Sequence, residues 1–295
     1  MPASNFRAFS SAVGGCVIQM ENGASRLSTY ALGHDAHELT RLGRQSEIFE
    51  SFTRQLFRES GIGPGMQILD VGSGAGDVAF LAADLIGPMG HVTGVDCAEA
   101  AVQWATARCL ARRIENVDFL LGDPAEMVFK APFDAVVGRF VLMYYPDPIC
   151  AIRSLAQHLR PGGIMVFQEF DMSYVRSYPA APTFEHASKL MTNTLHTLGT
   201  RVQLGADLYS IFVAAGLPGP SMRMDVLIGG GAKFPGYEIL AETIQSLLPA
   251  MERFGITTAT AVNLPSLAER MREEVIARNG IAFSPALIGA WSRES

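Results

Sequence analysis

Apolar residues recur along this chain with two alternating periods, one typical of strands and one typical of helices. Short apolar runs occupy 66–72, 90–96, 117–123, 133–144 and 162–170. Between the first, second and third runs, and again before the last, segments carry apolar residues at helical spacing. Strands that alternate with helices of this length form βαβ units around a parallel sheet. The strand segments are nearly continuous apolar runs, as expected when helices cover both faces of the sheet.

Helical spacing also marks three segments outside this core: 28–62, 172–220 and about 233–279. Two late strands are predicted at 221–230 and 280–293, and we expect the second to be one strand with a bulge at Pro285. The pattern therefore predicts an α/β fold, a Rossmann-like, doubly wound sheet of seven mostly parallel strands with helical N-terminal and inserted lid segments.

The predicted organisation has five parts. They are a flexible segment (1–27), a helical N-terminal cover (28–62), the sheet core (63–171), a helical insertion or lid (172–220) and a last part (221–295) that holds two core strands and a helical substrate cap (about 233–279). The first part lacks the basic start and apolar run of a signal peptide.

The composition of the chain argues against several kinds of binding partner and site. The chain of 295 residues is 48% hydrophobic and carries a formal net charge of −6, with no run rich in Lys or Arg, which argues against nucleic-acid binding. No apolar stretch reaches the roughly 18–20 residues of a membrane span. The four cysteines form no CxxC pair and none lies near a His at ligand spacing, so we expect no disulfide framework, no metal site and a reduced cytoplasmic location.

The chemistry-bearing stretch runs from Asp70 to Asp77 and contains Gly72, Gly74 and Gly76. Its spacing is G-x-G-x-G, whereas the dinucleotide fingerprint is G-x-G-x-x-G, and no Gly-Lys-Ser/Thr of a phosphate loop follows. A carboxylate beside a tight glycine turn suits a ligand with a positive amino group, and the free N–H groups at a helix start suit a carboxylate. S-adenosylmethionine carries both groups on its amino acid end.

The stretch ILDVGSGAGD (68–77) resembles the glycine motif of class I S-adenosylmethionine-dependent methyltransferases, of the small-molecule, UbiE-like type. The resemblance covers about 60–171, with its elements in the family's order. It implies a seven-stranded Rossmann-like fold and S-adenosylmethionine as cofactor, with S-adenosylhomocysteine as the product. The cofactor-binding residues that it implies in the loop are Asp70, Gly72, Ser73, Gly74 and Gly76.

Further motifs extend this resemblance. VTGVD ends in Asp96, which in the family binds the ribose hydroxyls, with Cys97 beside it; the alternative is a helix N-cap. FLLGDPAEM contains Asp123, which in the family reaches the adenine amino group; the alternative is a turn residue before a proline. The adenine pocket would also be lined by Gly122, Pro124 and Ala125.

FDAVVGRFVLMYYPDP resembles the fourth-strand motif and LRPGGIMVFQEFD the fifth strand with its turn. We assign Arg139 and Phe140 to the cofactor site, although a charged residue in an apolar strand can also form a buried structural pair. The leading segment, Y-x-L-G … E-L-T-R-L-x-x-Q, resembles an N-terminal cover of small-molecule methyltransferases. That likeness places Tyr30, Arg41 and Gln45 at the cofactor.

Three residues are candidates for catalysis. Tyr144 follows the fourth strand, at the rim where open α/β sheets bind ligands. Glu169 ends the fifth strand and could accept a proton or be a solvated loop acid. His196 lies on the following helical segment and could be a base or a structural residue.

The sequence thus predicts methyl transfer from S-adenosylmethionine to a small, largely apolar molecule of secondary metabolism, at oxygen, nitrogen or carbon. Two alternatives stay open: a cofactor-binding scaffold or cyclisation catalyst that does not methylate, and an NAD(P)-dependent oxidoreductase. The glycine spacing and the lack of a Tyr-x-x-x-Lys pair disfavour the oxidoreductase. We expect a small-molecule partner, no nucleic acid and no membrane, and leave a homodimer open.

Overall fold

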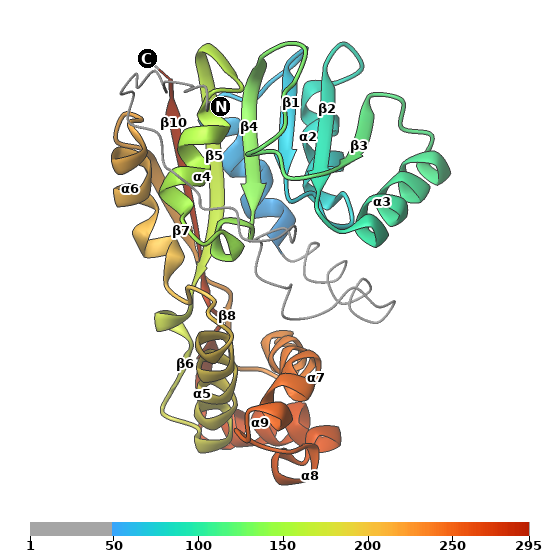
Figure 1. Ribbon diagram of the computed structural model, residues 1–295. Coiled ribbons are helices and arrows are strands. Elements are labelled where there is room, and N and C mark those ends of the chain that lie inside the picture. The colour runs from blue at the N-terminus through green and yellow to red at the C-terminus, as the bar shows by residue number, and fades with distance from the viewer. Residues whose placement is uncertain (1–48, 295) are drawn as a thin grey trace, which may run out of the picture.

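The computed structural model describes residues 49–294 (Figure 1). The predicted flexible segment 1–27 and the part of the predicted cover before Phe49 lie outside these residues. No helix within the described range is long and apolar enough to span a membrane.

The core of the molecule is a seven-stranded sheet in the order β3-β2-β1-β4-β5-β10-β7. Its strands are β1 (Gln67–Val71), β2 (His91–Asp96), β3 (Val117–Leu121), β4 (Phe133–Arg139), β5 (Leu159–Asp171), β7 (Ser221–Asp225) and β10 (Ala286–Arg293). The first five strands run parallel, and β10 is antiparallel to both β5 and β7. The predicted seven-stranded, mostly parallel sheet is confirmed.

Helices cover both faces of this sheet, which explains the continuous apolar runs of its strands. One face packs against the helical residues 49–60, α2 (Asp77–Ile86) and α3 (Glu99–Arg112). The other face packs against α4 (Pro148–Ala156) and α6 (Leu204–Ala215). Although α6 falls within the expected lid (172–220), it therefore belongs to the layers of the core.

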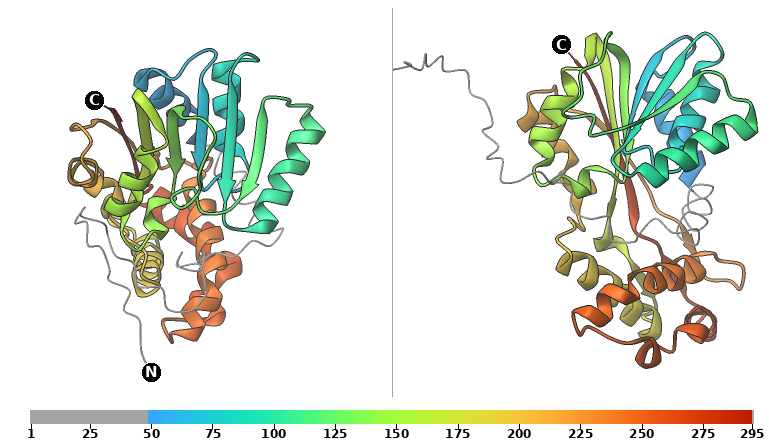
Figure 2. Two further views of the ribbon diagram at one scale, coloured as in Figure 1. Left: turned by 45° about the horizontal axis from the view of Figure 1, so that its top comes forward. Right: turned by 45° about the vertical axis from the view of Figure 1, so that its right-hand side comes forward.

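A second lobe lies beyond the carboxyl ends of the parallel strands (Figures 1 and 2). It contains α5 (Pro182–Thr197), α7 (Gly236–Arg253), α8 (Ala259–Val262), α9 (Leu267–Ala277) and the strands β6 (Arg176–Tyr178), β8 (Ile228–Gly229) and β9 (Ile281–Phe283). The short 3-10 turns η1 (Leu142–Tyr144) and η2 (Met172–Tyr174) follow β4 and β5, and η3 (Leu264–Ser266) stands between α8 and α9. The three strands form a small antiparallel sheet, and α5, α7 and α9 share one apolar cluster. We call this lobe the cap.

The prediction of single strands at 221–230 and 280–293 was wrong, because each segment is divided between the two sheets. The antiparallel pair β7–β10 of the core is followed by the pair β8–β9 of the cap. Pro285, which has no N–H for a sheet ladder, stands at the break. At the same point the Ser284 N–H donates to the Leu227 carbonyl at 2.9 Å, and the Leu227 N–H donates to Ser284 Oγ at 3.1 Å. These bonds fix the passage from one sheet to the other.

The assignment of α6 to the core predicts a large stability difference between adjacent residues. Phe212 is fully buried and Val213 is 48% exposed. We expect Phe212→Ala to lower the free energy of unfolding by about 3–5 kcal/mol and Val213→Ala by under about 0.5 kcal/mol. Denaturant unfolding followed by circular dichroism measures both. Equal losses would show that α6 does not pack on the sheet as described.

Candidate functional site

The glycine loop is a tight turn between β1 and α2. Gly72 and Gly76 have φ angles of +65° and +87°, in the left-handed region that favours glycine. The Ser73 N–H donates to the Val95 carbonyl of β2 at 3.0 Å, and the Gly76 N–H donates to the Ser73 carbonyl at 2.8 Å. The turn is therefore fixed to the neighbouring strand and directs the first turn of α2 toward the strand ends.

Val141 packs against two glycines, Gly72 in the loop after β1 and Gly138 in β4. A Cβ on Gly72 would overlap with Val141 Cγ2, and one on Gly138 would lie 2.9 Å from Val141 Cγ1. No real side chain tolerates such approaches without a shift of its neighbours. Glycine at both positions therefore lets the turn after β4 approach the turn after β1.

Asp96 holds the glycine loop and the start of α3 together. Its Oδ2 accepts the Gly74 N–H at 2.8 Å and its Oδ1 accepts the Ala98 N–H at 2.9 Å. Each carboxylate oxygen keeps a lone pair for a ligand hydroxyl. Beside it, the Cys97 thiol donates to the Gly122 carbonyl at 3.1 Å, which joins the turns after β2 and β3. The expected role of Asp96 at a ribose is compatible with this geometry. The helix N-cap alternative is wrong, because the N-cap of α3 is Ala98, whose N–H Asp96 accepts.

Asp123 is held by two partners. Its Oδ1 accepts the Ala125 N–H and the Tyr145 hydroxyl, each at 2.9 Å. Burial, followed by the charge of Asp123, raises the pKa of Tyr145. The Pro124 carbonyl lies 2.8 Å from His158 Nε2. Sequence reasoning missed Tyr145 and His158, since nothing in a Tyr-Tyr pair or a lone His marks a partner that lies far along the chain.

The buried Asp70 and the half-buried Arg139 lie on the face of the sheet that packs against residues 49–60. Burial raises the pKa of Asp70 to about 8, against the opposing charge of Arg139. Burial lowers the pKa of Arg139, whose guanidinium donates to Thr53 Oγ1 at 3.1 Å. The Thr53 hydroxyl donates in turn to Gln168 Oε1 at 2.9 Å. This hydrogen-bonded chain links the ends of β4 and β5 through a helix, and neither Thr53 nor Gln168 was predicted.

Three buried polar atoms of this region have no hydrogen-bond partner within residues 49–294: Asp70 Oδ2, Ser73 Oγ and Gln168 Nε2. Buried polar groups are nearly always hydrogen-bonded, so three unpartnered atoms in one region indicate that a ligand binds there. A carboxylate oxygen suits an ammonium group, while a hydroxyl and an amide N–H suit a carboxylate. These residues therefore fit the amino acid end of S-adenosylmethionine.

Phe140 stands where the core meets the cap. Its φ of +59° is unusual for a bulky residue and costs about 1–2 kcal/mol. Its ring stacks on Phe170, with centroids 3.9 Å apart and planes within 10°, and Phe49 meets both rings edge-on. Its N–H donates to the Gln168 carbonyl at 2.9 Å. The stack and this bond hold the strained residue and build an apolar wall at the strand ends.

The catalytic candidates lie in different places. Tyr144 is half-buried in η1, immediately after the turn that carries Val141. Glu169 is fully buried, and its Oε1 accepts the N–H groups of Val141 and Leu142 at 2.9 and 2.7 Å. His196 is exposed in the last turn of α5, and no described contact joins it to the glycine loop. The predicted residues Tyr30, Arg41 and Gln45 lie outside the described residues.

The arrangement agrees with comparisons to known proteins. A family model described as a methyltransferase domain matches residues 62–216. The chain belongs to the class I S-adenosylmethionine-dependent methyltransferases. Nocamycin O-methyltransferase of Saccharothrix syringae is 37% identical over 118 residues, which are 40% of this chain and 42% of that protein. Demethylmenaquinone methyltransferase of Lactococcus lactis is 31% identical over 137 residues, 46% of this chain and 52% of that protein.

This methyltransferase chain thus spans about half the length of the curated relatives it matches. Among solved structures, the YcgJ protein of Bacillus subtilis aligns with a TM-score of 0.51 at 17% identity, over 83% of this chain and all (100%) of that one. A phosphoethanolamine N-methyltransferase of Haemonchus contortus aligns with a TM-score of 0.50 at 17% identity, over 83% of this chain and 53% of that one. At these identities the structures show the fold that is shared.

The contact of Val141 with Gly72 predicts coupling between the two positions. We expect Gly72→Ala to lower the free energy of unfolding by about 1–3 kcal/mol, because a methyl group has no room beside Val141. In a Val141→Ala background the same change should cost less, by at least about 0.5 kcal/mol. Gly74→Ala, where a Cβ meets nothing within 4 Å, is the control without steric overlap. Additive effects of the two changes in urea unfolding would contradict the packing described.

The buried carboxyl of Asp70 predicts a pH dependence of stability. Without ligand, the folded protein keeps a proton on Asp70 up to about pH 8, whereas an unfolded chain releases it near pH 3.9; a bound ammonium group would favour the ionised form. The unfolded state therefore binds fewer protons in this window, and stability falls as the pH rises through it. Without ligand, the melting temperature should drop less between pH 5 and 8 in Asp70→Asn than in the wild type. An equal drop of the melting temperature in both proteins would contradict the raised pKa of Asp70. Glu169 is present in both proteins, so its titration does not affect the comparison.

Proposed function

We propose that this protein transfers the methyl group of S-adenosylmethionine to a small, largely apolar molecule. The observation that carries the proposal is the set of unpartnered buried atoms on Asp70, Ser73 and Gln168 beside the glycine loop. A phosphate or pyrophosphate site would place no carboxylate there, because like charges repel. Membership of the methyltransferase family supports the same cofactor.

The residues present fit each part of that cofactor. Asp70, Ser73 and Gln168 would hold its amino acid end, and Asp96 the ribose hydroxyls. Asp123, whose orientation Tyr145 fixes, would face the adenine. The adenine pocket would also be lined by Cys97, Gly122, Pro124 and Ala125. When bound, the sulfonium supplies an electrophilic methyl group, so the main task of the protein is to align an acceptor with it and keep water away.

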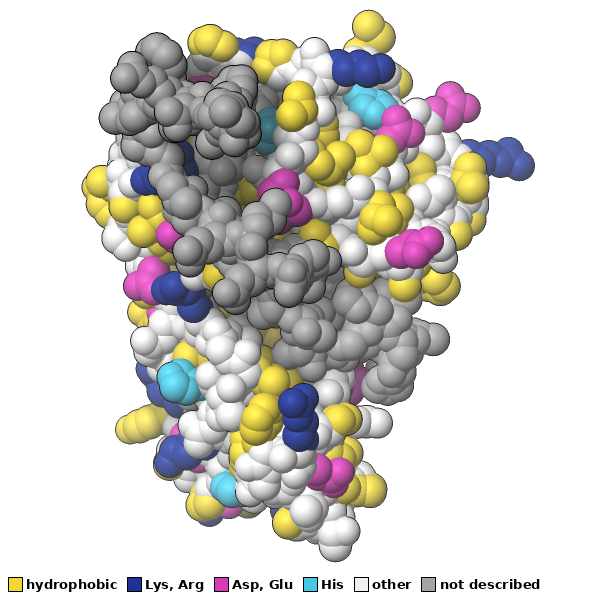
Figure 3. Space-filling model, viewed as in Figure 1, with side chains coloured by type: hydrophobic (Ala, Val, Ile, Leu, Met, Phe, Trp, Pro, Cys, Tyr) yellow, Lys and Arg dark blue, Asp and Glu magenta, His cyan; other side chains and the backbone are white. Residues whose placement is uncertain are grey.

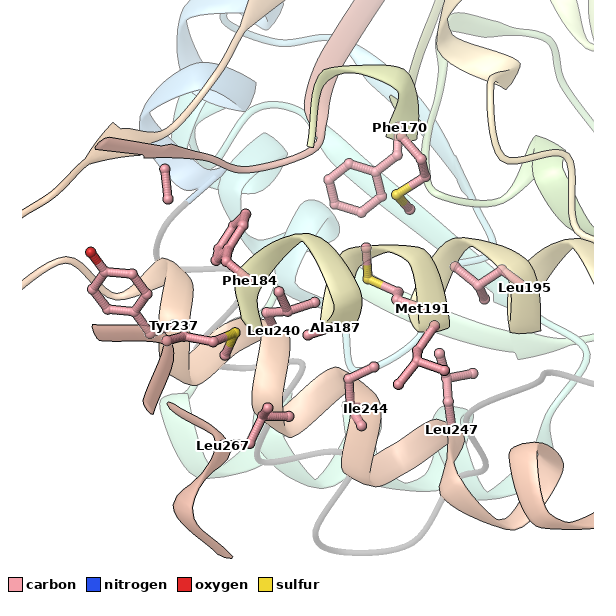
Figure 4. Packing of buried hydrophobic residues seen from close by; sticks show 14 of the residues in the cluster. Phe170, Phe184, Ala187, Met191, Leu195, Tyr237, Leu240, Ile244, Leu247 and Leu267 are labelled. Atoms are coloured by element: carbon pink, nitrogen blue, oxygen red, sulfur yellow. The ribbon is translucent and has the colours of Figure 1, made fainter. Parts of the chain in front are cut away.

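Apolar side chains at the junction of core and cap support an apolar acceptor. Phe140 and Phe170 form the wall of the core, and Figure 4 shows Phe170 facing the helix that carries Met191 and Leu195. Most hydroxyls of α5 donate to a carbonyl one turn earlier in the helix: for example, Thr194 donates to the Leu190 carbonyl at 2.7 Å. A polar acceptor would find few partners here, since polar groups buried without hydrogen bonds are costly.

The acceptor is expected to be a small molecule that reaches the site from the side of the core that carries Tyr144. Oxygen, nitrogen and carbon acceptors of secondary metabolism all suit the site, and the relatives named for nocamycin and demethylmenaquinone support a small-molecule acceptor. Tyr144 is the side chain of the core that we place nearest to the acceptor. On the face seen in Figure 3, Lys and Arg are scattered singly, which with the net charge of −6 supports the absence of a nucleic-acid partner. The cytoplasmic location and a homodimer stay predictions.

Calorimetric titration with S-adenosylmethionine and S-adenosylhomocysteine tests the cofactor. Wild type should bind both, and Asp96→Ala should bind about 10–100-fold more weakly, since it loses hydrogen bonds to a charged group. Asp118→Ala is the control, because this exposed acid on β3 pairs with His91 away from the loop. No binding by the wild type would refute the proposal.

Incubation of the loaded protein with apolar aromatic and terpenoid acceptors, followed by mass spectrometry, tests the reaction. A gain of one methylene with release of S-adenosylhomocysteine is the expected result. An altered but unmethylated product that still needs the cofactor would favour the cyclisation alternative instead.

A further inference from the structure

Glu169 lies on the face of the sheet opposite to the unpartnered atoms of the cofactor site. It pairs with Ile288 of β10, and the start of α6 packs against the Glu169 carbonyl and Ile288 through Gly205. Gln168, the preceding residue, contacts Thr53 on the other face, as the alternation of a strand requires. The Glu169 carboxylate is therefore separated from the amino acid site by the sheet itself.

The backbone of the turn after β4 already occupies one carboxylate oxygen of Glu169. Oε1 accepts two backbone N–H groups, at 2.9 Å from Val141 and 2.7 Å from Leu142. Oε2 is buried and has no hydrogen-bond partner within residues 49–294. A general base has to reach the proton that it removes, directly or through one water. The position of Glu169 instead suits a residue that acts on the turn after β4.

That turn follows β4 and meets the glycine loop. Phe140, with its positive φ, precedes Val141, and the Val141 side chain occupies the space left by Gly72 and Gly138. A strained turn persists only when its surroundings over-determine it. The two hydrogen bonds to Oε1 supply such a constraint, because they fix two successive N–H groups next to the contact with Gly72.

We propose that Glu169 is a positioning residue of the cofactor site, which holds Val141 against Gly72 and so sets the shape of the glycine loop. This inference rests on the proposed binding of S-adenosylmethionine. What Glu169 supplies is an acceptor oxygen at a given reach and not a negative charge. Burial raises the pKa of Glu169 to about 8, which agrees with a role that a neutral group can also fill.

Three substitutions separate this role from that of a base. Glu169→Gln keeps an oxygen at the same reach, Glu169→Asp keeps the charge but is one methylene shorter, and Glu169→Leu keeps the volume without an acceptor. We expect Glu169→Gln to bind S-adenosylhomocysteine within about 3-fold of wild type, and the other two at least about 10-fold more weakly. Calorimetry gives the affinities and thermal melting gives the folded fraction.

Glu185→Leu is the matched control. Glu185 also uses one oxygen, Oε1, to accept two hydrogen bonds, from the N–H and the hydroxyl of Ser177 at 2.7 and 2.8 Å, but it lies in the cap. Its loss should lower the melting temperature and leave the affinity for S-adenosylhomocysteine within about 3-fold of wild type. This control separates a general loss of stability from a specific loss of binding.

The rank order of the variants decides the inference. Weak binding by Glu169→Asp together with near-normal binding by Glu169→Gln supports the positioning role of Glu169. This holds even if Glu169→Leu fails to fold. Normal binding by Glu169→Asp or by a folded Glu169→Leu, or weak binding by Glu169→Gln, overturns it while the proposed function stands. A wild-type protein that binds neither S-adenosylmethionine nor S-adenosylhomocysteine overturns the proposed function and the inference together.

Discussion

The packing of Val141 between Gly72 and Gly138 is the constraint on which the site depends. It joins the turns that follow two neighbouring parallel strands, β1 and β4, at the edge where open α/β sheets bind ligands. Side chains at either glycine would push the turns apart. The close approach fixes a loop whose Ser73, Gly74 and Gly76 N–H groups bond to β2 and within the loop, beside the buried carboxyl of Asp70.

The polar part of the site comes from the ends of several strands. β1 supplies Asp70, β2 supplies Asp96, β4 supplies Arg139 and β5 supplies Gln168. Because parallel strands end at the same edge, residues far apart in sequence meet there. The apolar cluster of the cap packs against Phe140 and Phe170 at this edge. A polar, pre-arranged site for the cofactor thus adjoins an apolar surface, which is the division that the proposed transfer of a methyl group to an apolar molecule needs.

The sequence predicted those features that depend on local pattern. The sheet follows from alternating periods, and the glycine loop follows from spacing. Thr53, Gln168, Tyr145 and His158 could not be predicted, because each matters through a partner that only the fold brings near. The division of 280–293 between two sheets could not be predicted either, since it depends on the pairing of Ser284 with Leu227.

The most direct test of this account compares two ligands that differ only in the amino acid end. S-adenosylhomocysteine has that end, and 5′-methylthioadenosine lacks it. If the unpartnered atoms near Asp70 hold an ammonium and a carboxylate, calorimetry should show S-adenosylhomocysteine binding at least about 100-fold more tightly, since hydrogen bonds to charged groups contribute about 1.5–3 kcal/mol each. Equal affinities would contradict the account, because the buried groups would then have another purpose.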